Sequence, residues 1–475
     1  MSKETYDDQN LFEAESGMQE QANLATRANF SGRLGFVLAT AGSAVGLGNI
    51  WRFPYLAASY GGGAFVVVYI ILAVTFGYTV MISETAIGRY TRKSVIGAYN
   101  SLTNSKFLRA GSWITALIPL LILPYYSVIG GWVCKYFVDY LIHPASHAAG
   151  DTYFNDFIGT AASSELWFLV FAVLTIIIIL GGVQSGVERA SKFMMPLLII
   201  IAIILAIYAV TRPGAMEGVK YLFIPHLEDF SIMTVVAAMG QMFYSLSLAM
   251  GILFTYGSYM KKNVNIEKAS YQVVAMDSSV ALLAAIIIIP SVFAFYGGEP
   301  EVLSAGPSLM FITIPKVFAS MGLGRIAGAA FFLLVLFAAL TSSISLAETC
   351  ISTFEDELHW NRRRASVVLF VIMIGLGTLS SLGYNVLGNV TVMGLAFLDF
   401  FDFLTNSVMM PIAALFCCIL IIKVTGFKLI SDEIKLSSNF RTENVYRVVI
   451  KYLAPIFLVV ILVSSVLNTL GIITM

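Results

Sequence analysis

The chain has 475 residues, of which 58% are hydrophobic and only 12% charged, whereas soluble domains carry about 25% charged residues. This composition excludes an ordinary soluble domain and is typical of a membrane protein. The 28 basic residues balance 28 acidic ones, so no net charge favours binding to nucleic acid. The cysteines lack the spacing of a disulfide framework or a metal site, and we expect them to be small buried hydrophobic residues: Cys134, Cys350, Cys417 and Cys418.

Long apolar segments recur along the chain at the length that crosses a bilayer. A hydrocarbon core of about 30 Å needs about twenty apolar residues per helix. The run after Arg33 lacks the cleavage pattern of a signal peptide, so we expect it to be kept as the first span. Eleven segments meet the length, at about 34–57, 62–87, 111–142, 166–182, 189–211, 231–260, 267–297, 325–353, 365–383, 391–422 and 446–473.

Basic residues fall mainly on one side of these predicted spans. If the N-terminus is cytoplasmic, 22 of the 28 Lys and Arg residues lie in the N-terminal tail and inner loops, and five lie in the outer loops. The positive-inside rule therefore predicts a cytoplasmic N-terminus and, after eleven crossings, an outer C-terminus. The long outer loop at 297–325 is either a lid over an entrance or a plain solvated loop.

Two predicted spans have small and polar residues at mid-membrane. Residues 41–49 read AGSAVGLGN, and residues 245–251 read SLSLAMG. Unwound backbone in hydrocarbon is tolerated only where its freed amides and carbonyls line a cavity or meet a ligand such as a carboxylate or a sodium ion. At either position alone, the small residues could serve only close helix packing. Their matching places in spans one and six, in two five-helix halves, favour a transporter with an inverted repeat.

Ionisable residues inside the spans also need an explanation, because a charge at mid-bilayer costs about 2.5–3.5 kcal/mol. Arg52 and Asp402 lie near the outer ends of spans one and ten, where a direct or water-bridged pair would close the outer mouth. Arg27 and Asp356 could close the inner mouth in the same way. The alternative is that each is an interfacial charge without a gating role. Asp277, in span seven, is either a sodium ligand or a protonated carboxyl.

Several short motifs occur between Arg27 and the tenth span. They are GLGNIWRFPY at 46–55, GGGAF at 61–65, Glu84 with GRY at 88–90, YY at 125–126, TSS at 341–343 and FEDE at 354–357. In these motifs the chain resembles the neurotransmitter:sodium symporters, and the bacterial amino-acid transporters among them.

The resemblance implies an all-α membrane protein with 11 transmembrane helices. These form a 5+5 inverted repeat in which helices 1 and 6 are unwound. The implied units are a cytoplasmic tail at 1–30 that carries Arg27, a first repeat at 31–212, a second repeat at 231–422, and a cytoplasmic loop with helix 11 at 423–475. The resemblance also implies a multi-pass protein in the lipid bilayer of the bacterial inner membrane.

A substrate site and two sodium sites follow from the same resemblance, with oxygen ligands that suit a hard cation. The substrate site would comprise Gly46, Leu47, Ile122, Tyr126, Tyr244, Ser247, Met250, Ser342, Ser345 and Leu346. The first sodium would be held, with the substrate carboxylate, by Ala44, Asn49, Ser245 and Asp277. The second would be held by Gly42, Val45, Ala338, Thr341 and Ser342.

Single residues in these sets bear on the substrate. The family's monoamine carriers have an aspartate at the position of Gly46, where it replaces a missing substrate carboxylate, so a glycine leaves room for a whole amino acid. Tyr126 and the amides of span one would hold its carboxylate. Tyr244 stands where phenylalanine is usual, Phe30 where tryptophan is usual, and Ala249 where glycine is usual. A stiffer turn at Ala249 favours small or medium apolar side chains over tryptophan.

Chloride dependence in the family's animal members needs a tyrosine, a glutamine and serines. Tyr69, Gln241 and Ser245 match these ligands, but Ala281 takes the place of a serine and Asp277 that of a nearby asparagine. A fixed carboxylate repels chloride and supplies its negative charge instead. We therefore expect chloride independence.

We predict a sodium-coupled secondary active symporter that imports a neutral, hydrophobic amino acid by alternating access, with spans one, two, six and seven moving against three, four, eight and nine. The expected partners are two sodium ions, the amino-acid substrate and the bilayer. The alternatives are a sodium-dependent amino-acid sensor without net transport, and a transporter of another small carboxylate-bearing amine. Asp277 could also return a proton. Catalysis is disfavoured because the spans hold no nucleophile with a base and no metal cluster. The sequence gives no basis for an oligomeric state.

Overall fold

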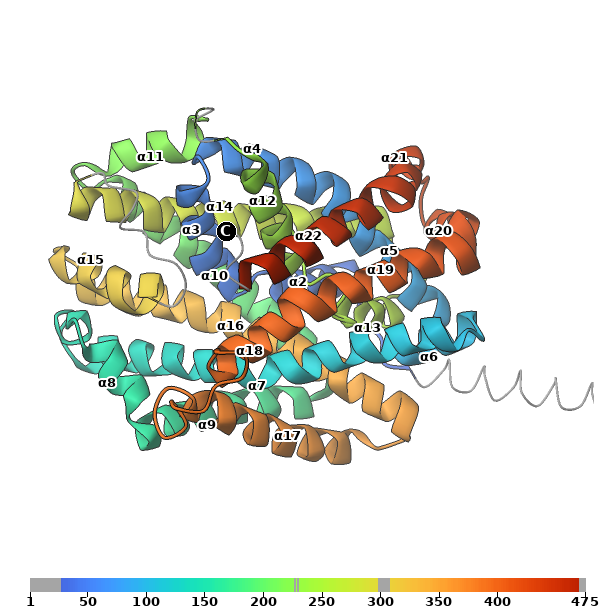
Figure 1. The fold of residues 1–475 in the computed structure, drawn as a ribbon, viewed down its shortest axis with the longest axis horizontal. Coiled ribbons are helices and arrows are strands. Elements are labelled where there is room, and N and C mark those ends of the chain that lie inside the picture. Colours follow the sequence, from blue (N-terminus) through green and yellow to red (C-terminus); the bar gives the residue numbers. More distant parts are fainter. Residues whose placement is uncertain (1–26, 226–227, 229, 298–307, 470–475) are drawn as a thin grey trace, which may run out of the picture.

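The computed structural model describes residues 27–225, 228, 230–297 and 308–469, and this part of the chain is built from helices joined by short loops. Figure 1 shows the long helices running roughly side by side along the molecule. Within the described residues, extended backbone pairs only at two isolated bridges, Gly62 with Pro225 and Val392 with Leu395. The all-α prediction is confirmed.

Nine described helical stretches are long and apolar enough to cross a membrane. They are α4–α5 (Gly63–Thr91), α7 (Lys106–Ile142), α9 (Ala161–Leu180), η4–α10 (Val183–Val210), α14 (Ile266–Tyr296), α16 (Gly324–Leu358), α17 (Arg362–Leu382), α18–α20 (Phe397–Lys435) and α21–α22 (Glu443–Thr469). A tenth is the bent pair formed by α2 (Arg33–Ala44) and η1–α3 (Gly48–Ser59), whose two halves meet at 57°. The chain is therefore a multi-pass membrane protein.

The sixth predicted span, like the first, consists of two shorter helices. These are α12 (Ile232–Ser245) and α13 (Ile252–Ser258), separated by residues 246–251. Neither helix has the length of a full span. The eleven-helix count and the 5+5 repeat accordingly stay predictions.

Both predicted breaks occur, and the first is shorter than expected. The amide of Val45 donates to the carbonyl of Ala41 at 2.7 Å, so α2 keeps its helical bonds up to that point and only residues 45–47 separate it from η1. The second break follows the prediction closely. It places Ser247 and Ala249 at φ 53° and 58°, a left-handed backbone that side chains disfavour.

Short helices in the loops gather at two opposite ends of the molecule. In Figure 1, α8 (Tyr153–Gly159), α11 (Ala215–Phe223) and α15 (Ile314–Ser320) lie at the left end, and α6 (Val95–Leu102), α20 (Gly426–Lys435) and α21 (Glu443–Val448) at the right. This separation agrees with the predicted division of the loops into two sides. Residues 1–26 of the predicted tail and 298–307 of the predicted lid lie outside the described residues.

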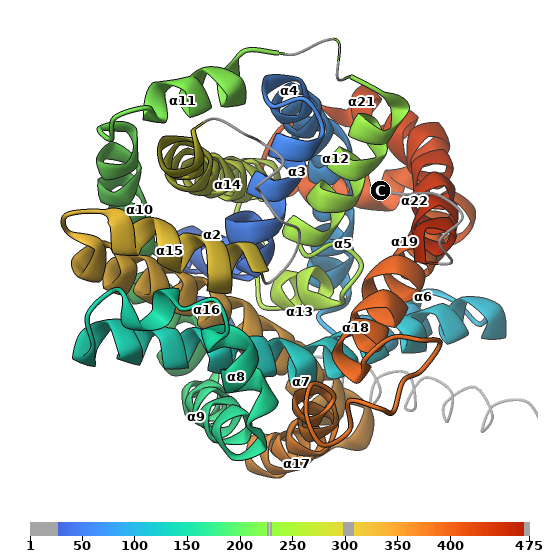
Figure 2. The same ribbon diagram turned by 60° about the vertical axis from the view of Figure 1, so that its left-hand side comes forward.

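The broken helices lie toward the middle of the bundle. Figure 2 shows α2, α3, α12 and α13 there, with α4, α14, α16, α7 and α18 around them. Contact with α5 (Tyr78–Thr91) fixes α13, because a Cβ at Gly257 would lie 3.0 Å from the Cα of Thr85. Glycine therefore allows the backbones of α13 and α5 to approach closely.

Candidate functional site

A small cavity of about 30 Å³ lies where the two breaks meet. Nine of the ten predicted substrate residues line it, namely Gly46, Leu47, Ile122, Tyr126, Tyr244, Ser247, Met250, Ser342 and Leu346. The tenth, Ser345, does not line it, because its hydroxyl accepts a hydrogen bond from Tyr256 at 2.8 Å and donates to the carbonyl of Thr341 at 2.9 Å. The structure adds three lining residues outside the predicted substrate and sodium sets, Ser43, Gly48 and Ile252.

Hydrogen-bond donors meet at one side of this cavity. The amide of Leu47 donates to the hydroxyl of Tyr126 at 3.3 Å. A Cβ at Gly46 would lie 2.9 Å from Oγ of Ser342 and 3.1 Å from the Tyr126 hydroxyl. Any side chain at position 46 would therefore fill the space between these groups, and glycine keeps the space open.

The ring of Tyr244 covers the break on α2. A Cβ at Gly48 would lie 2.7 Å from Cε1 of this ring. The guanidinium of Arg52 lies over this ring, 5.7 Å from its centroid. Gly48 thus lets an aromatic ring close over the unwound backbone.

Backbone carbonyls freed at the first break converge on one hydroxyl. Oγ of Ser342 lies 3.3 Å from the carbonyl oxygen of Gly42, 3.1 Å from that of Ser43 and 3.3 Å from that of Val45. A hydroxyl has a single hydrogen to donate, so it cannot satisfy all three acceptors. The surplus of oxygen lone pairs makes this a place that a small hard cation suits.

The remaining predicted ligands of the second sodium lie beside these carbonyls. The hydroxyl of Thr341 donates to the carbonyls of Phe337 and Ala338, at 2.9 and 3.2 Å. A Cβ at Gly42 would be 3.0 Å from Cβ of Thr341. The five residues predicted for the second sodium are therefore brought together between α2 and α16.

A second group of oxygen atoms surrounds the buried carboxylate of Asp277 on α14. The carboxylate accepts hydrogen bonds from Asn49 at 2.7 Å, from Ser245 at 2.8 Å and from Tyr69 at 2.9 Å. Among the described residues no basic side chain forms an ion pair with it. Ala44, the fourth residue predicted for the first sodium, lines the cavity next to Asn49 and Ser245. A buried carboxylate with neutral donors alone favours a bound cation nearby.

Arg27 connects the segment before α2 to the ends of α13 and α16. It forms an ion pair with Asp356 and donates to Oγ of Ser258 and of Ser352, at 2.8 and 2.9 Å. Its guanidinium also lies 5.0 Å from the ring centroid of Tyr259. Burial alone would lower the pKa of Arg27, but Tyr259 and Asp356 raise it above its ordinary value. We name Arg27, Ser258, Ser352 and Asp356 the Arg27 cluster.

The other predicted gate is built differently. Arg52 and Asp402 are both described, and no direct ion pair joins them in the part of the chain that the structure covers. Asp402 instead accepts hydrogen bonds from the hydroxyl of Tyr125 at 3.2 Å and from the amide of Asn406 at 2.5 Å. Arg52 keeps its contact with the face of Tyr244. We name Arg52, Tyr244, Asp402, Tyr125 and Asn406 the Arg52 side.

The model of the sodium:neurotransmitter symporter family matches residues 27–165 and 156–472, nearly the whole described chain. The chain belongs to this family. A sodium-dependent transporter of Bacillus subtilis is 34% identical over 94% of this chain and 98% of its own length. One of Haemophilus influenzae is 32% identical over 93% of this chain and 99% of its own. The solved structure of MhsT in complex with L-phenylalanine matches this chain with a TM-score of 0.83 and 36% identity. The match covers 92% of this chain and 100% of the MhsT chain.

Membership of the family confirms the predicted resemblance and makes the chain a sodium-dependent transporter rather than an enzyme. The residues in which this symporter departs from its family's pattern have defined places in the structure. Phe30 is buried against the rings of Phe36, Tyr256 and Tyr259. Ala249 lies in the second break, where its amide donates to Glu84 at 3.0 Å.

Proposed function

We propose that this symporter imports a neutral amino acid with an apolar side chain, coupled to sodium, by alternating access. The observation that carries the proposal is the cavity between the two breaks, where peptide groups and hydroxyls stand beside apolar side chains and Gly46 contributes no side chain. The complex of MhsT with L-phenylalanine, a relative that shares the fold at 36% identity, supports the same ligand class.

Each end of the amino acid finds a partner of suitable chemistry. The amide of Leu47 and the hydroxyl of Tyr126, now bonded to each other, are two donors for a carboxylate. The carbonyl of Ser43, which accepts from the hydroxyl of Ser247 at 3.1 Å, suits the ammonium group. Apolar surface for the side chain comes from Ile122, Met250, Ile252 and Leu346.

Two sodium ions are the proposed co-substrates, one for each group of oxygen atoms. The first would bind between Ala44, Asn49, Ser245 and Asp277, where the carboxylate has no basic partner among the described residues. The second would bind between α2 and α16, where three carbonyls share the single hydrogen of Ser342. One charge moved through 100 mV releases about 2.3 kcal/mol, and a tenfold gradient adds about 1.4 kcal/mol. Two ions would therefore supply roughly 7 kcal/mol, enough for about 10⁵-fold accumulation.

Chloride independence is part of the proposal. Asp277 places a fixed carboxylate within 2.9 Å of the Tyr69 hydroxyl and 2.8 Å of Oγ of Ser245, two groups that would have to bind the anion. Replacement of chloride by gluconate should leave the uptake rate unchanged, and a severalfold loss would contradict this part. If that loss were observed, Asp277→Asn should create no new need for chloride, because the carboxylate would not be standing in for the anion.

The direct test is uptake by purified protein in vesicles with an inward sodium gradient. Each of the twenty amino acids is supplied in labelled form, and vesicles with equal sodium on both sides serve as the control. We expect accumulation of one or more apolar amino acids only with the gradient. Sodium-dependent binding without accumulation would instead identify a sensor. The proposed topology, with a cytoplasmic N-terminus, an outer C-terminus and the bacterial inner membrane as location, is testable with cysteine reagents that do not cross the membrane.

A further inference from the structure

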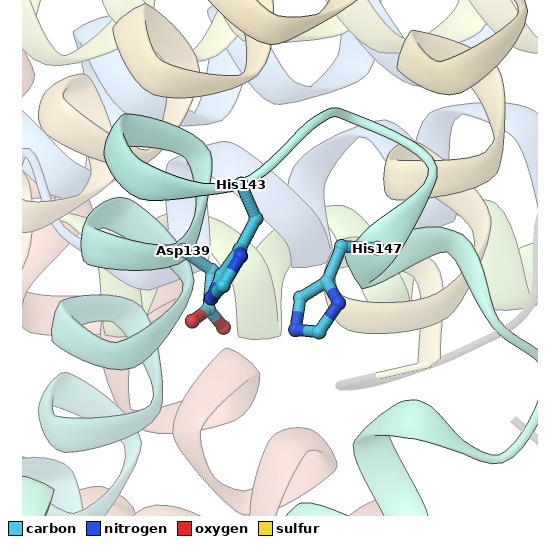
Figure 3. A group of neighbouring side chains, drawn as sticks. All are labelled: Asp139, His143 and His147. Carbon is cyan, nitrogen blue, oxygen red and sulfur yellow. The ribbon is translucent and has the colours of Figure 1, made fainter.

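A group of metal-ligating side chains lies far from the cavity, where α7 ends. Asp139 belongs to the last turn of α7, His143 directly follows the helix, and His147 begins the short helix η3 (His147–Ala149). Spacings of four residues keep the first two on one face of the helix. Figure 3 shows the carboxylate and the two imidazole rings turned toward one another on that face. One ligand atom from each residue lies within 4.8 Å of the others.

The backbone holds this arrangement before any ion binds. The amide of His143 donates to the carbonyl of Asp139 at 2.8 Å, and the amide of His147 donates to the carbonyl of Pro144 at 3.0 Å. The two imidazole rings are 4.2 Å apart between centroids. Because Asp139 is buried while His147 is exposed, the site is open to solvent from one side.

The donor set selects the kind of ion. Two imidazole nitrogens and one carboxylate oxygen are the three protein ligands of many four-coordinate zinc sites, in which water takes the fourth position. Calcium and magnesium prefer oxygen ligands throughout. The group therefore suits Zn²⁺ or a similar transition-metal ion, which is different chemistry from that of the proposed sodium sites.

A lysine competes for the same carboxylate. Nζ of Lys135 lies 2.5 and 2.6 Å from the two carboxylate oxygens of Asp139, so a metal ion must displace it. Lys135 has a second partner available, because Nζ also lies 2.8 Å from the hydroxyl of Tyr153. The ammonium can therefore keep a hydrogen bond when the carboxylate turns to a metal ion.

We propose that Asp139, His143 and His147 form a binding site for Zn²⁺ or a related transition-metal ion, with Lys135 as the cation that occupies the carboxylate when the metal is absent. The site would fasten the end of α7 to the loop before α8. Next to this loop, α8 begins with Tyr153, whose ring lies 5.1 Å from His147, and Phe154, which stacks on Phe311 at 5.0 Å. The inference does not depend on which substrate is transported.

The test uses full-length protein from which any affinity tag has been removed, stripped of metal with a chelator and titrated with Zn²⁺ against a fluorescent zinc indicator. We expect one equivalent bound by the unchanged chain. The double variant His143→Gln, His147→Gln should lose this equivalent, and His359→Gln, which removes an exposed histidine at the end of α16, should retain it. Full binding by the double variant, or none by the unchanged chain, would overturn the proposal.

Two further variants separate a metal site from a structural role of these residues. Loss of an outer partner of a metal ligand weakens binding about 10–100-fold, and loss of a ligand itself should cost at least as much. Asp139→Asn should weaken Zn²⁺ binding by at least about tenfold, whereas Lys135→Met should strengthen it, because the competing ammonium is gone. Zn²⁺ should raise the thermal unfolding temperature of the unchanged chain and of Lys135→Met but not of the double variant. An unchanged affinity in Lys135→Met would contradict the proposed competition.

Discussion

The two proposed gates of the transporter are closed by different kinds of contact. In the Arg27 cluster, one guanidinium forms an ion pair and two hydrogen bonds to hydroxyls, and links the segment before α2 to α13 and α16. On the Arg52 side, the guanidinium contacts only the face of Tyr244 among the groups described for it, and Asp402 bonds to Tyr125 and Asn406.

This difference indicates which of the two groups of contacts contributes more to the stability of the closed conformation. A partly buried charge pair is expensive to break, because the remaining charge has lost its partner. A cation over an aromatic ring contributes about 0.5–1 kcal/mol where it is solvent-exposed. We therefore expect the Arg27 cluster to resist opening more strongly than the Arg52 side, where a single aromatic layer covers the cavity.

The largest expected effect follows from breaking the Arg27 cluster. Removal of one partner of a buried pair costs about 3–5 kcal/mol, and because these side chains are 11% and 18% exposed, we expect about 2 kcal/mol after discounting for solvent. Arg27→Ala should thus raise the opening equilibrium about thirtyfold, seen as faster hydrogen exchange of the amides of α2. Arg33→Ala is the matched control and should leave exchange unchanged; equal exchange in both variants would contradict the account.

The aromatic layer gives the second prediction. Tyr244→Ala removes the ring that packs against Gly48 and should lower sodium-driven uptake by at least about tenfold, as expected for a loss of about 1.4 kcal/mol. Tyr244→Phe keeps the ring and should change uptake by less than about threefold. If the phenylalanine variant is as impaired as the alanine variant, the hydroxyl rather than the ring closes the cavity.

A smaller effect is expected for Arg52. Arg52→Gln removes the contact with Tyr244 and should speed the release of bound labelled amino acid by about two- to fivefold. A double-mutant cycle with Asp402→Asn should give a coupling energy below about 0.5 kcal/mol, because no direct pair joins the two side chains. A coupling above about 1 kcal/mol would show that a water-bridged pair closes this side.

The smallest effect concerns the second break. An alanine in the left-handed region destabilises the folded state by about 1–2 kcal/mol. Glycine removes this strain, but its greater conformational freedom stabilises the unfolded chain by about 0.5–1 kcal/mol, so the net gain in stability is small. Ala249→Gly should therefore raise the thermal unfolding temperature slightly. The control Ala329→Gly, in the regular helix α16, should lower the free energy of unfolding by about 1 kcal/mol. A loss of similar size in Ala249→Gly would argue against backbone strain at φ 58°.

Prediction from sequence worked where residue type alone limits the structure. Small and polar residues at matching places in spans one and six indicated unwound backbone, and nine of ten expected substrate residues line the cavity. The four cysteines are buried and free, as expected. These features depend on local composition and spacing.

Features that depend on packing could not be predicted in the same way. Nothing in the sequence marks where unwinding starts, so the persistence of the helical bonds of α2 to Val45 could not be predicted. Ser43 was missed because it acts through its carbonyl, which every residue possesses. A direct pair of Arg52 with Asp402 is absent from the described residues, because Tyr125 and Asn406 donate to the same carboxylate; a water-bridged pair stays a prediction.

The central claim, that the cavity at the two breaks binds an amino acid together with sodium, is tested most directly by equilibrium binding of labelled L-phenylalanine to the purified protein. The unchanged chain should bind it in sodium and not when potassium replaces sodium. Gly46→Val, which fills the space between Ser342 and Tyr126, should abolish binding while the protein stays folded by its elution and unfolding temperature. Binding that persists without sodium, or that survives Gly46→Val, would contradict the account.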